Sequence, residues 1–239
     1  MWYRFNRLLF RLWFRVQVPY RVEGRHYEPP VPFIVVANHA SAVDIPLVAL
    51  ALQARVAFMA KEELARLVGV RLWIRSLGSF FVRRDQADRT ALRTARDRLA
   101  RGWAIGVFAE GTRSLDGRLQ PFQQGAAYLA LRAGVPVLPL GIGGSHRIMP
   151  KGVRWPRRAP VVIRLGPPMA VPRVEGRLSH ALVRTWTARF EAAVAALLPA
   201  EQQPLRPPTA SAAATAARSG HSAPAATSSG TPPSSEERD

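Results

Sequence analysis

The sequence contains no cysteine and few acidic residues. Without cysteine the chain cannot form a disulfide framework, a thiolate zinc site or a cysteine nucleophile. Against 34 lysines and arginines stand only 16 aspartates and glutamates, so the formal net charge is +18. This excess implies an anionic partner, which can be a nucleic acid, an acidic membrane surface or a phosphorylated substrate.

The N-terminal segment lacks an uninterrupted apolar run, because arginines recur at Arg4, Arg7, Arg11 and Arg15. This spacing places them on one stripe of a helix and excludes an ordinary transmembrane helix or signal peptide. Apolar residues line the remainder of the helix: Trp2, Phe5, Leu9, Leu12, Trp13 and Val16. We predict that residues 1–19 form an amphipathic helix lying in a membrane interface. The alternative is a helix whose apolar side packs against the rest of the protein.

Between residues 20 and 198, short apolar runs alternate with helical patterns. Strands are predicted at about 33–38, 56–60, 79–84, 103–111, 135–142 and 160–166. One helix is predicted to begin at about residue 43, and further helical stretches end at about residue 76. Other helices are predicted at about 86–101, 124–133 and 179–198. Buried strands separated by helices are typical of a single α/β domain with a mainly parallel sheet flanked by helices.

Residues 199–239 differ in composition from the rest of the chain. They are rich in Pro, Ala, Ser and Thr, with a single Leu and no aromatic residue. Such a segment cannot bury enough apolar surface to fold, so we predict a disordered C-terminal tail.

The segment NHASAVD, residues 38–44, joins a predicted strand to a helix. A carboxylate at Asp44 can bond one imidazole nitrogen of His39 and leave the other to accept a proton. Ser41 is better placed to cap the helix than to act as a nucleophile. Because a G-x-S-x-G motif is also missing, the expected nucleophile is a substrate hydroxyl that His39 activates. The alternative is a purely structural pair.

Two further strand ends carry polar residues. FAEGTRS, residues 108–114, combines a turn glycine with hydroxyl and guanidinium donors that can hold a phosphate, although it is not a nucleotide phosphate loop. Within it, Glu110 either binds a substrate hydroxyl or braces Arg113. GSFFVRR, residues 78–84, ends in two arginines. Parallel strands end at one edge of a sheet, so we expect these segments and His39 to share a crevice. The alternatives are an ordinary turn and a solvated basic strand end.

Four segments in order resemble the motifs of the glycerolipid acyltransferases, the lysophosphatidic acid acyltransferase family. NHASAVD resembles the N-H-x-x-x-x-D block, and GSFFVRR resembles G-x-x-F-I/V-x-R. FAEGTRS resembles F-P-E-G-T-R-S, with Ala109 in place of the proline, and VPVLPLGI resembles the fourth block, V-P-V-x-P-V. The resemblance covers about residues 20–198.

The resemblance implies acyl transfer from acyl-CoA or acyl-carrier protein to the sn-2 hydroxyl of lysophosphatidic acid, giving phosphatidic acid. It implies His39 as general base, oriented by Asp44. The residues implied to bind the acceptor are Arg84, Glu110, Gly111, Thr112, Arg113 and Ser114, with Lys61 as a further phosphate contact. We expect no cofactor or metal ion, and a peripheral or monotopic location at the cytoplasmic face of the cell membrane.

Two other functions remain open at this point. One is acyl transfer to a different lysolipid, such as a lyso-ornithine lipid, with the same His–Asp pair. The other is nucleic-acid binding, which the sequence pI of about 11.7 favours. However, no helix-turn-helix, zinc or RNP pattern is present, and the aromatic residues gather in the N-terminal stripe instead of forming a stacking platform.

Overall fold

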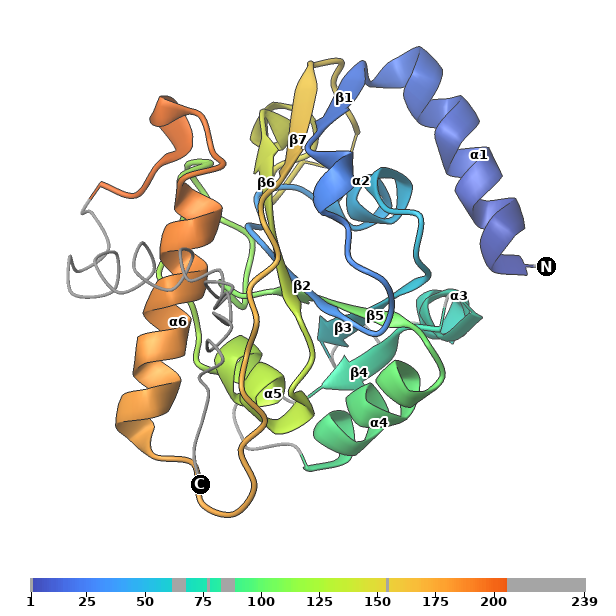
Figure 1. The fold of residues 1–239 in the computed structure, drawn as a ribbon. Helices are drawn as coiled ribbons and strands as arrows, with labels where there is room; N and C mark the ends of the chain where they lie inside the picture. Colours follow the sequence, from blue (N-terminus) through green and yellow to red (C-terminus); the bar gives the residue numbers. More distant parts are fainter. Residues whose placement is uncertain (1, 62–67, 77, 83–88, 154, 206–239) are drawn as a thin grey trace, which may run out of the picture.

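The structure, a computed structural model, describes residues 2–61, 68–76, 78–82, 89–153 and 155–205 (Figure 1). Within these residues seven strands form one sheet: β1 (Tyr20–Glu23), β2 (Ile34–Ala37), β3 (Val56–Lys61), β4 (Phe80–Val82), β5 (Ala104–Phe108), β6 (Val137–Gly143) and β7 (Val161–Leu165). The α-helices are α1 (Trp2–Gln17), α2 (Asp44–Ala51), α3 (Val68–Ser76), α4 (Arg89–Ala100), α5 (Gly125–Ala133) and α6 (His180–Ala195). Short 3-10 turns are η1 (Arg25–Tyr27), η3 (Ser145–Arg147) and η4 (Ala200–Gln202).

The sheet is mainly parallel, as predicted, with the strand order β1-β7-β6-β2-β5-β3-β4. From β6 to β4 all neighbouring strands run parallel. Only the pairing of β6 with β7 is antiparallel, so β7 and its parallel neighbour β1 run against the other five strands. The carboxyl ends of β2, β5, β3 and β4 therefore lie at a common edge.

Helices cover both faces of the sheet (Figure 1). Ile34 and Val36 of β2 face a core formed with α4, α5 and α6. Val35 and Ala37, which alternate with them, face a second core formed with α1 and α2. All four residues are at most 2% exposed. A strand buried on both faces reads as a continuous apolar run, which is why the sequence located β2 correctly.

The sequence did not predict β1, whose residues Tyr20–Glu23 read YRVE. This strand lies at the edge of the sheet and is only partly buried. Its charged side chains stay near solvent, where Arg21 and Arg164 both pair with Glu23 at 2.9 and 2.8 Å. Short edge strands carry charge at little cost, so their sequences lack the apolar run that marks a central strand.

Helix α1 packs one stripe against the domain and leaves another exposed. Phe14 is fully buried, and the Arg7 guanidinium donates to the backbone carbonyls of Leu52 and Gln53 at the end of α2. The exposed stripe is apolar and comprises Trp2, Phe5, Leu8, Leu9, Leu12, Trp13 and Val16, which are 37–68% exposed. The apolar side predicted to face a membrane thus does not pack on the domain.

No helix in the described part of the chain is both long enough and apolar enough to cross a membrane.

Candidate active site

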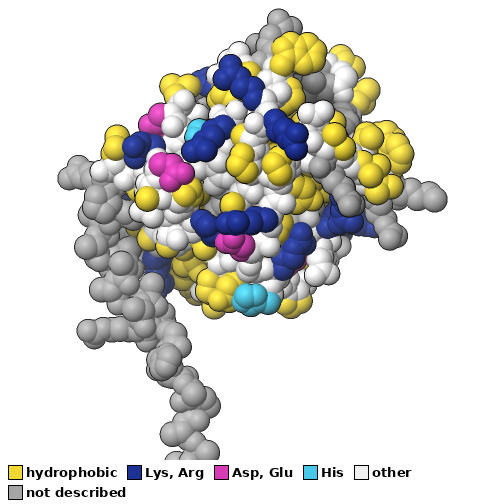
Figure 2. Space-filling model, turned by 90° about the horizontal axis from the view of Figure 1, so that it is seen from above, with side chains coloured by type: hydrophobic (Ala, Val, Ile, Leu, Met, Phe, Trp, Pro, Cys, Tyr) yellow, Lys and Arg dark blue, Asp and Glu magenta, His cyan; other side chains and the backbone are white. Residues whose placement is uncertain are grey.

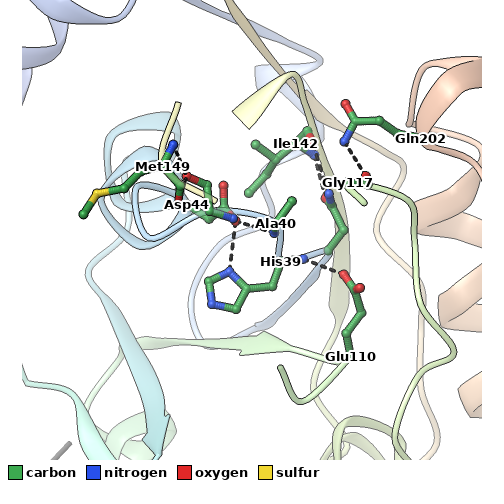
Figure 3. Close-up of polar contacts among 10 residues, drawn as sticks. His39, Ala40, Asp44, Glu110, Gly117, Ile142, Met149 and Gln202 are labelled. Atoms are coloured by element: carbon green, nitrogen blue, oxygen red, sulfur yellow. Dashed lines mark hydrogen bonds and ion pairs between the residues drawn. The ribbon is translucent and has the colours of Figure 1, made fainter. Parts of the chain in front are cut away.

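The carboxyl ends of β2 and β5 bring the first and third motifs together (Figure 3). Ala37 lies opposite Phe108 in the parallel ladder, so the residues that follow each strand are neighbours. The Ala109 N–H extends this ladder by donating to the Ala37 carbonyl at 3.2 Å. A proline at this position has no N–H for that bond, so alanine adds a backbone contact here.

His39 and Asp44 form the predicted pair. Asp44 is fully buried at the start of α2, and its Oδ2 lies 2.9 Å from His39 Nδ1. The same oxygen accepts the backbone N–H groups of Ala40 at 2.8 Å and Ser41 at 2.7 Å. An oxygen that accepts these two bonds also acts as acceptor toward the ring, so Nδ1 carries the hydrogen. His39 Nε2 then has a free lone pair and can take a proton from a hydroxyl.

The His39 ring is fixed by its surroundings. It stacks on Phe108 with the centroids 4.2 Å apart, and the side chain is 14% exposed. The preceding residue, Asn38, is clamped to β6, because its amide accepts the Ile142 N–H at 2.8 Å and donates to the Ile142 carbonyl at 3.1 Å. Backbone, ring and tautomer are therefore set before any substrate binds.

Ser41 does not cap α2, contrary to our expectation. Val43 occupies the N-cap position and provides no side-chain cap. The Ser41 hydroxyl instead donates to the Met149 carbonyl at 3.0 Å and accepts the Met149 N–H at 3.2 Å. Asp44 itself accepts the N–H groups of Ala40 and Ser41, and the Ser41 hydroxyl anchors the turn to the segment after β6.

Glu110 is 4% exposed, and its carboxyl group contacts the backbone of His39. One carboxyl oxygen accepts the His39 N–H at 2.6 Å and the other accepts the Gln120 N–H at 3.0 Å. Burial raises the pKa of Glu110 from 4.5 to about 8, although the two backbone N–H donors lower it. Each oxygen thus has a partner within the protein, and among the described residues Glu110 forms no ion pair with Arg113, so the predicted bracing of Arg113 is not observed.

The loop after Glu110 divides into anchoring and free residues. Gly111 adopts φ +75°, a conformation that favours glycine. The Ser114 N–H donates to the His39 carbonyl at 2.8 Å, and its hydroxyl donates to Asp116 at 2.9 Å. Thr112 is exposed and Arg113 is half-buried, and no described residue forms a hydrogen bond or ion pair with either side chain. Thr112 and Arg113 are therefore the loop side chains available to a ligand.

Of the two remaining predicted residues, the structure describes only Lys61. Lys61 is the last residue of β3, and its backbone pairs with Val82 of β4. Both strands run parallel to β5, so Lys61 is at the edge that carries His39. Arg84 lies outside the described residues.

Gln202 supports the site, and sequence analysis missed it. It is 1% exposed; its amide oxygen accepts the Gly144 N–H at 2.6 Å and its amide nitrogen donates to the Gly117 carbonyl at 3.0 Å. Its own carbonyl accepts the Leu119 N–H at 2.9 Å. The boundary predicted after residue 198 is thus too early, because 199–205 belong to the folded domain. Residues 206–239 of the predicted tail lie outside the described residues.

Two truncations test the contribution of Gln202. Ending the chain at residue 199 removes a buried side chain and leaves three backbone groups without their Gln202 partners, so we expect a loss of about 2–4 kcal/mol in unfolding free energy. Ending it at residue 205 should leave stability unchanged. Thermal unfolding of both forms measures the difference, and equal melting temperatures would contradict the assigned role.

Comparison with known proteins places this geometry in a family. Residues 19–143 match the Acyltransferase family model. The chain belongs to the acyltransferase family. The match takes in the His39–Asp44 pair, the Glu110 loop and the greater part of the sheet.

Individual members of the acyltransferase family are also similar to this chain. The human 1-acyl-sn-glycerol-3-phosphate acyltransferase alpha is 30% identical over 175 residues, which cover 68% of this chain and 62% of the relative. A chloroplastic 1-acyl-sn-glycerol-3-phosphate acyltransferase from Brassica napus is 30% identical over 159 residues, which cover 62% of this chain and 45% of the relative. The chain therefore spans less than two thirds of the length of these relatives.

A solved structure is similar as well. The crystal structure of the 1-acyl-sn-glycerophosphate (LPA) acyltransferase PlsC from Thermotoga maritima has a TM-score of 0.60 and 39% sequence identity, covering 77% of this chain and 73% of that chain. The fold of this chain thus agrees with that of a solved acyltransferase over 77% of its length.

Proposed function

We propose that this acyltransferase moves a fatty acyl group from a thioester, acyl-CoA or acyl-carrier protein, to the sn-2 hydroxyl of 1-acyl-glycerol-3-phosphate. The observation that carries the proposal is the His39–Asp44 pair, fixed at the edge of the sheet beside a loop with two free donor side chains. The relatives are named for this reaction, which supports the assignment.

The proposed chemistry needs one base and no protein nucleophile. His39 Nε2 takes the proton of the acceptor hydroxyl as its oxygen attacks the thioester carbonyl. The resulting tetrahedral intermediate collapses with cleavage of the carbon–sulfur bond. The leaving thiolate takes the proton that His39 holds. Asp44 supports the transient imidazolium through its bond to Nδ1. The ester and the free thiol are the products, and the enzyme returns to its starting state.

Acceptor binding is assigned to the edge beside His39. Thr112 and Arg113 supply a hydroxyl and a guanidinium, which together suit a phosphate monoester. Lys61, the last residue of β3, and Arg84, which comes after β4 in the sequence, are proposed to extend this phosphate site. Glu110 and Ser114 support this site through hydrogen bonds that hold the His39 backbone and the loop in place.

Membrane docking through α1 completes the proposal. The exposed apolar stripe of α1 can enter the headgroup region, and the basic charge of the protein favours an anionic surface. Figure 2 shows Lys and Arg side chains spread across one face, with few acidic ones. The cations on that face are dispersed, which suits a membrane surface better than a nucleic-acid groove. We place the enzyme at the cytoplasmic face of the cell membrane.

The function is tested with purified protein in lipid vesicles. The protein is given a labelled acyl donor, either acyl-CoA or acyl-carrier protein, and lysophosphatidic acid as acceptor. We expect phosphatidic acid from at least one donor, and Arg113→Ala should raise the KM for the acceptor more than it lowers kcat. Lyso-ornithine lipid serves as the competing acceptor. Product from lyso-ornithine lipid alone would reject lysophosphatidic acid while retaining the acyltransferase reaction.

A further inference from the structure

A cavity of about 410 Å³ lies between the N-terminal half of α1 and the turn that joins α2 to β3. Its lining residues are Tyr3, Arg7, Leu8, Arg11, Gln53 and Arg55. The volume is within the range of small-ligand sites, and three of the six residues are arginines. The candidate active site does not use any of these residues.

The cavity lies at the opposite edge of the sheet from His39. Val56 is the first residue of β3 and pairs with Ala104, the first residue of β5, so this edge carries the amino ends of the strands. The Val56 N–H donates to the Tyr3 hydroxyl at 3.1 Å, which fixes the start of α1 at that edge. A ligand held here is therefore distinct from the acyl acceptor.

Three of the six lining residues, Tyr3, Arg7 and Arg55, are held in place without a ligand. The edge of the Trp103 ring system packs against Tyr3, with ring centroids 5.9 Å apart, and the Arg55 guanidinium lies 5.8 Å from the centroid of the same indole. Arg7 is bound to the carbonyls of Leu52 and Gln53. A preformed cluster of donors loses little conformational freedom when it binds an anion.

The hydrogen-bonding groups also favour an anion. Because the Tyr3 oxygen accepts the Val56 N–H, its own hydrogen is free to be donated. Burial raises the pKa of Tyr3, so the hydroxyl keeps this hydrogen at neutral pH. The neighbouring acid, Glu28, accepts the N–H groups of Gln53 and Ala54 at 2.8–2.9 Å and so partly satisfies its charge within the protein. Three guanidinium groups outweigh this single carboxylate.

The position of the cavity on α1 indicates which anion reaches it. Leu8 lines the cavity and is 54% exposed as part of the apolar stripe. The cavity thus opens where the apolar stripe of α1 meets its arginines. With the stripe embedded in a bilayer, that boundary lies at the depth of the lipid headgroups.

We propose that this cavity binds the phosphate headgroup of an anionic membrane phospholipid. Arg11 and Arg55 contact the phosphate, Tyr3 donates to it, and Arg7 adds charge while holding the helix to the domain. The bound lipid acts as a second attachment to the membrane beside the apolar stripe, and it is neither substrate nor product. The inference rests on α1 lying in the membrane interface and does not depend on the acyl-transfer reaction.

Calorimetry with dihexanoylphosphatidylglycerol below its micelle concentration tests the site without a membrane surface. We expect saturable binding of one lipid per full-length chain. The double variant Arg11→Gln/Arg55→Gln should weaken it about 10- to 30-fold, and Arg11→Lys/Arg55→Lys should restore part of it. Arg177→Gln/Arg184→Gln removes two exposed charges near the start of α6, on the opposite face of the sheet, and should leave binding unchanged.

Two further arms separate the possible sources of the anion. Arg113→Gln should not affect binding of this lipid; if it alone abolishes binding, the lipid occupies the active-site edge and the proposal fails. Coenzyme A carries phosphates too, and its affinity should be equal in wild type and Arg11→Gln/Arg55→Gln. A loss of coenzyme A binding with unchanged lipid binding would assign the cavity to the acyl donor and overturn the proposal. Inactivity in acyl transfer would leave this measurement unaffected.

Discussion

Replacing His39 by alanine should lower kcat of acyl transfer by about 1,000-fold or more, because general base catalysis contributes about 100- to 10,000-fold. The substituted protein should remain folded, since the bonds of Glu110 and Ser114 in this region go to the His39 backbone and survive the change. Product formation in vesicles, together with thermal unfolding, measures both quantities. Activity close to that of wild type would end the general-base proposal.

Two matched variants define what the histidine contributes. His180→Ala removes an exposed histidine at the start of α6 and should keep full activity. Asp44→Asn places an amide oxygen where Oδ2 accepts its three bonds, so the fold and the ring orientation should survive while the negative charge is lost. Its kcat should fall by about 100-fold, between wild type and His39→Ala. A larger loss from Asp44→Asn than from His39→Ala would contradict a purely supporting role.

The sequence predicted the central part of the fold because its signals there are local. β2 and β5 are buried, and their apolar residues stand next to one another in the chain. The His39–Asp44 pair was also accessible, since its members are five residues apart and separated by one turn. Where partners are close in sequence and residue type determines burial, the sequence pattern alone was enough to predict the strands and the His39–Asp44 pair.

The sequence could not assign side chains whose partners are distant in the chain. The Ser41 hydroxyl could cap α2 or bond a distant segment. In the structure it bonds Met149, which is 108 residues away. Gln202 bonds residues 58 and 85 positions away, in a segment whose composition resembles a disordered tail. Only the folded arrangement distinguishes these uses, because residue type permits both.

Glu110 illustrates the same limit at the centre of the site. From the sequence, its carboxylate beside Arg113 read as a group for substrate or for an ion pair. In the structure it joins the two segments that make the site, accepting one N–H from the His39 backbone and one from Gln120. We therefore propose that Glu110 positions His39, acting on the chemistry through the His39 backbone.

Replacing Glu110 by alanine should destabilise the protein and impair catalysis. Two buried N–H groups lose their acceptor, at a cost of about 1–3 kcal/mol each. Since one of them belongs to His39, kcat should fall by about 100-fold even at temperatures where the variant is folded. Denaturant unfolding and acyl transfer below the transition give the two numbers. A stable variant with normal kcat would show that the His39 backbone needs no such support.

The raised pKa of Glu110 adds a pH signature that a passive structural residue lacks. Its pKa is about 8 in the folded protein against 4.5 ordinarily, so between these values the folded state holds a proton that the unfolded chain releases. The contribution of Glu110 to the free energy of unfolding is therefore fully present below pH 4.5. It is lost as pH rises toward 8, by up to about 1.4 kcal/mol per pH unit. Glu110→Gln cannot titrate, so wild type should lose stability relative to this variant as pH rises over that range. Denaturant unfolding of both proteins between pH 5 and 8 measures this change. A pH-independent difference would mean that the folded protein holds Glu110 ionised, with the two N–H donors outweighing burial.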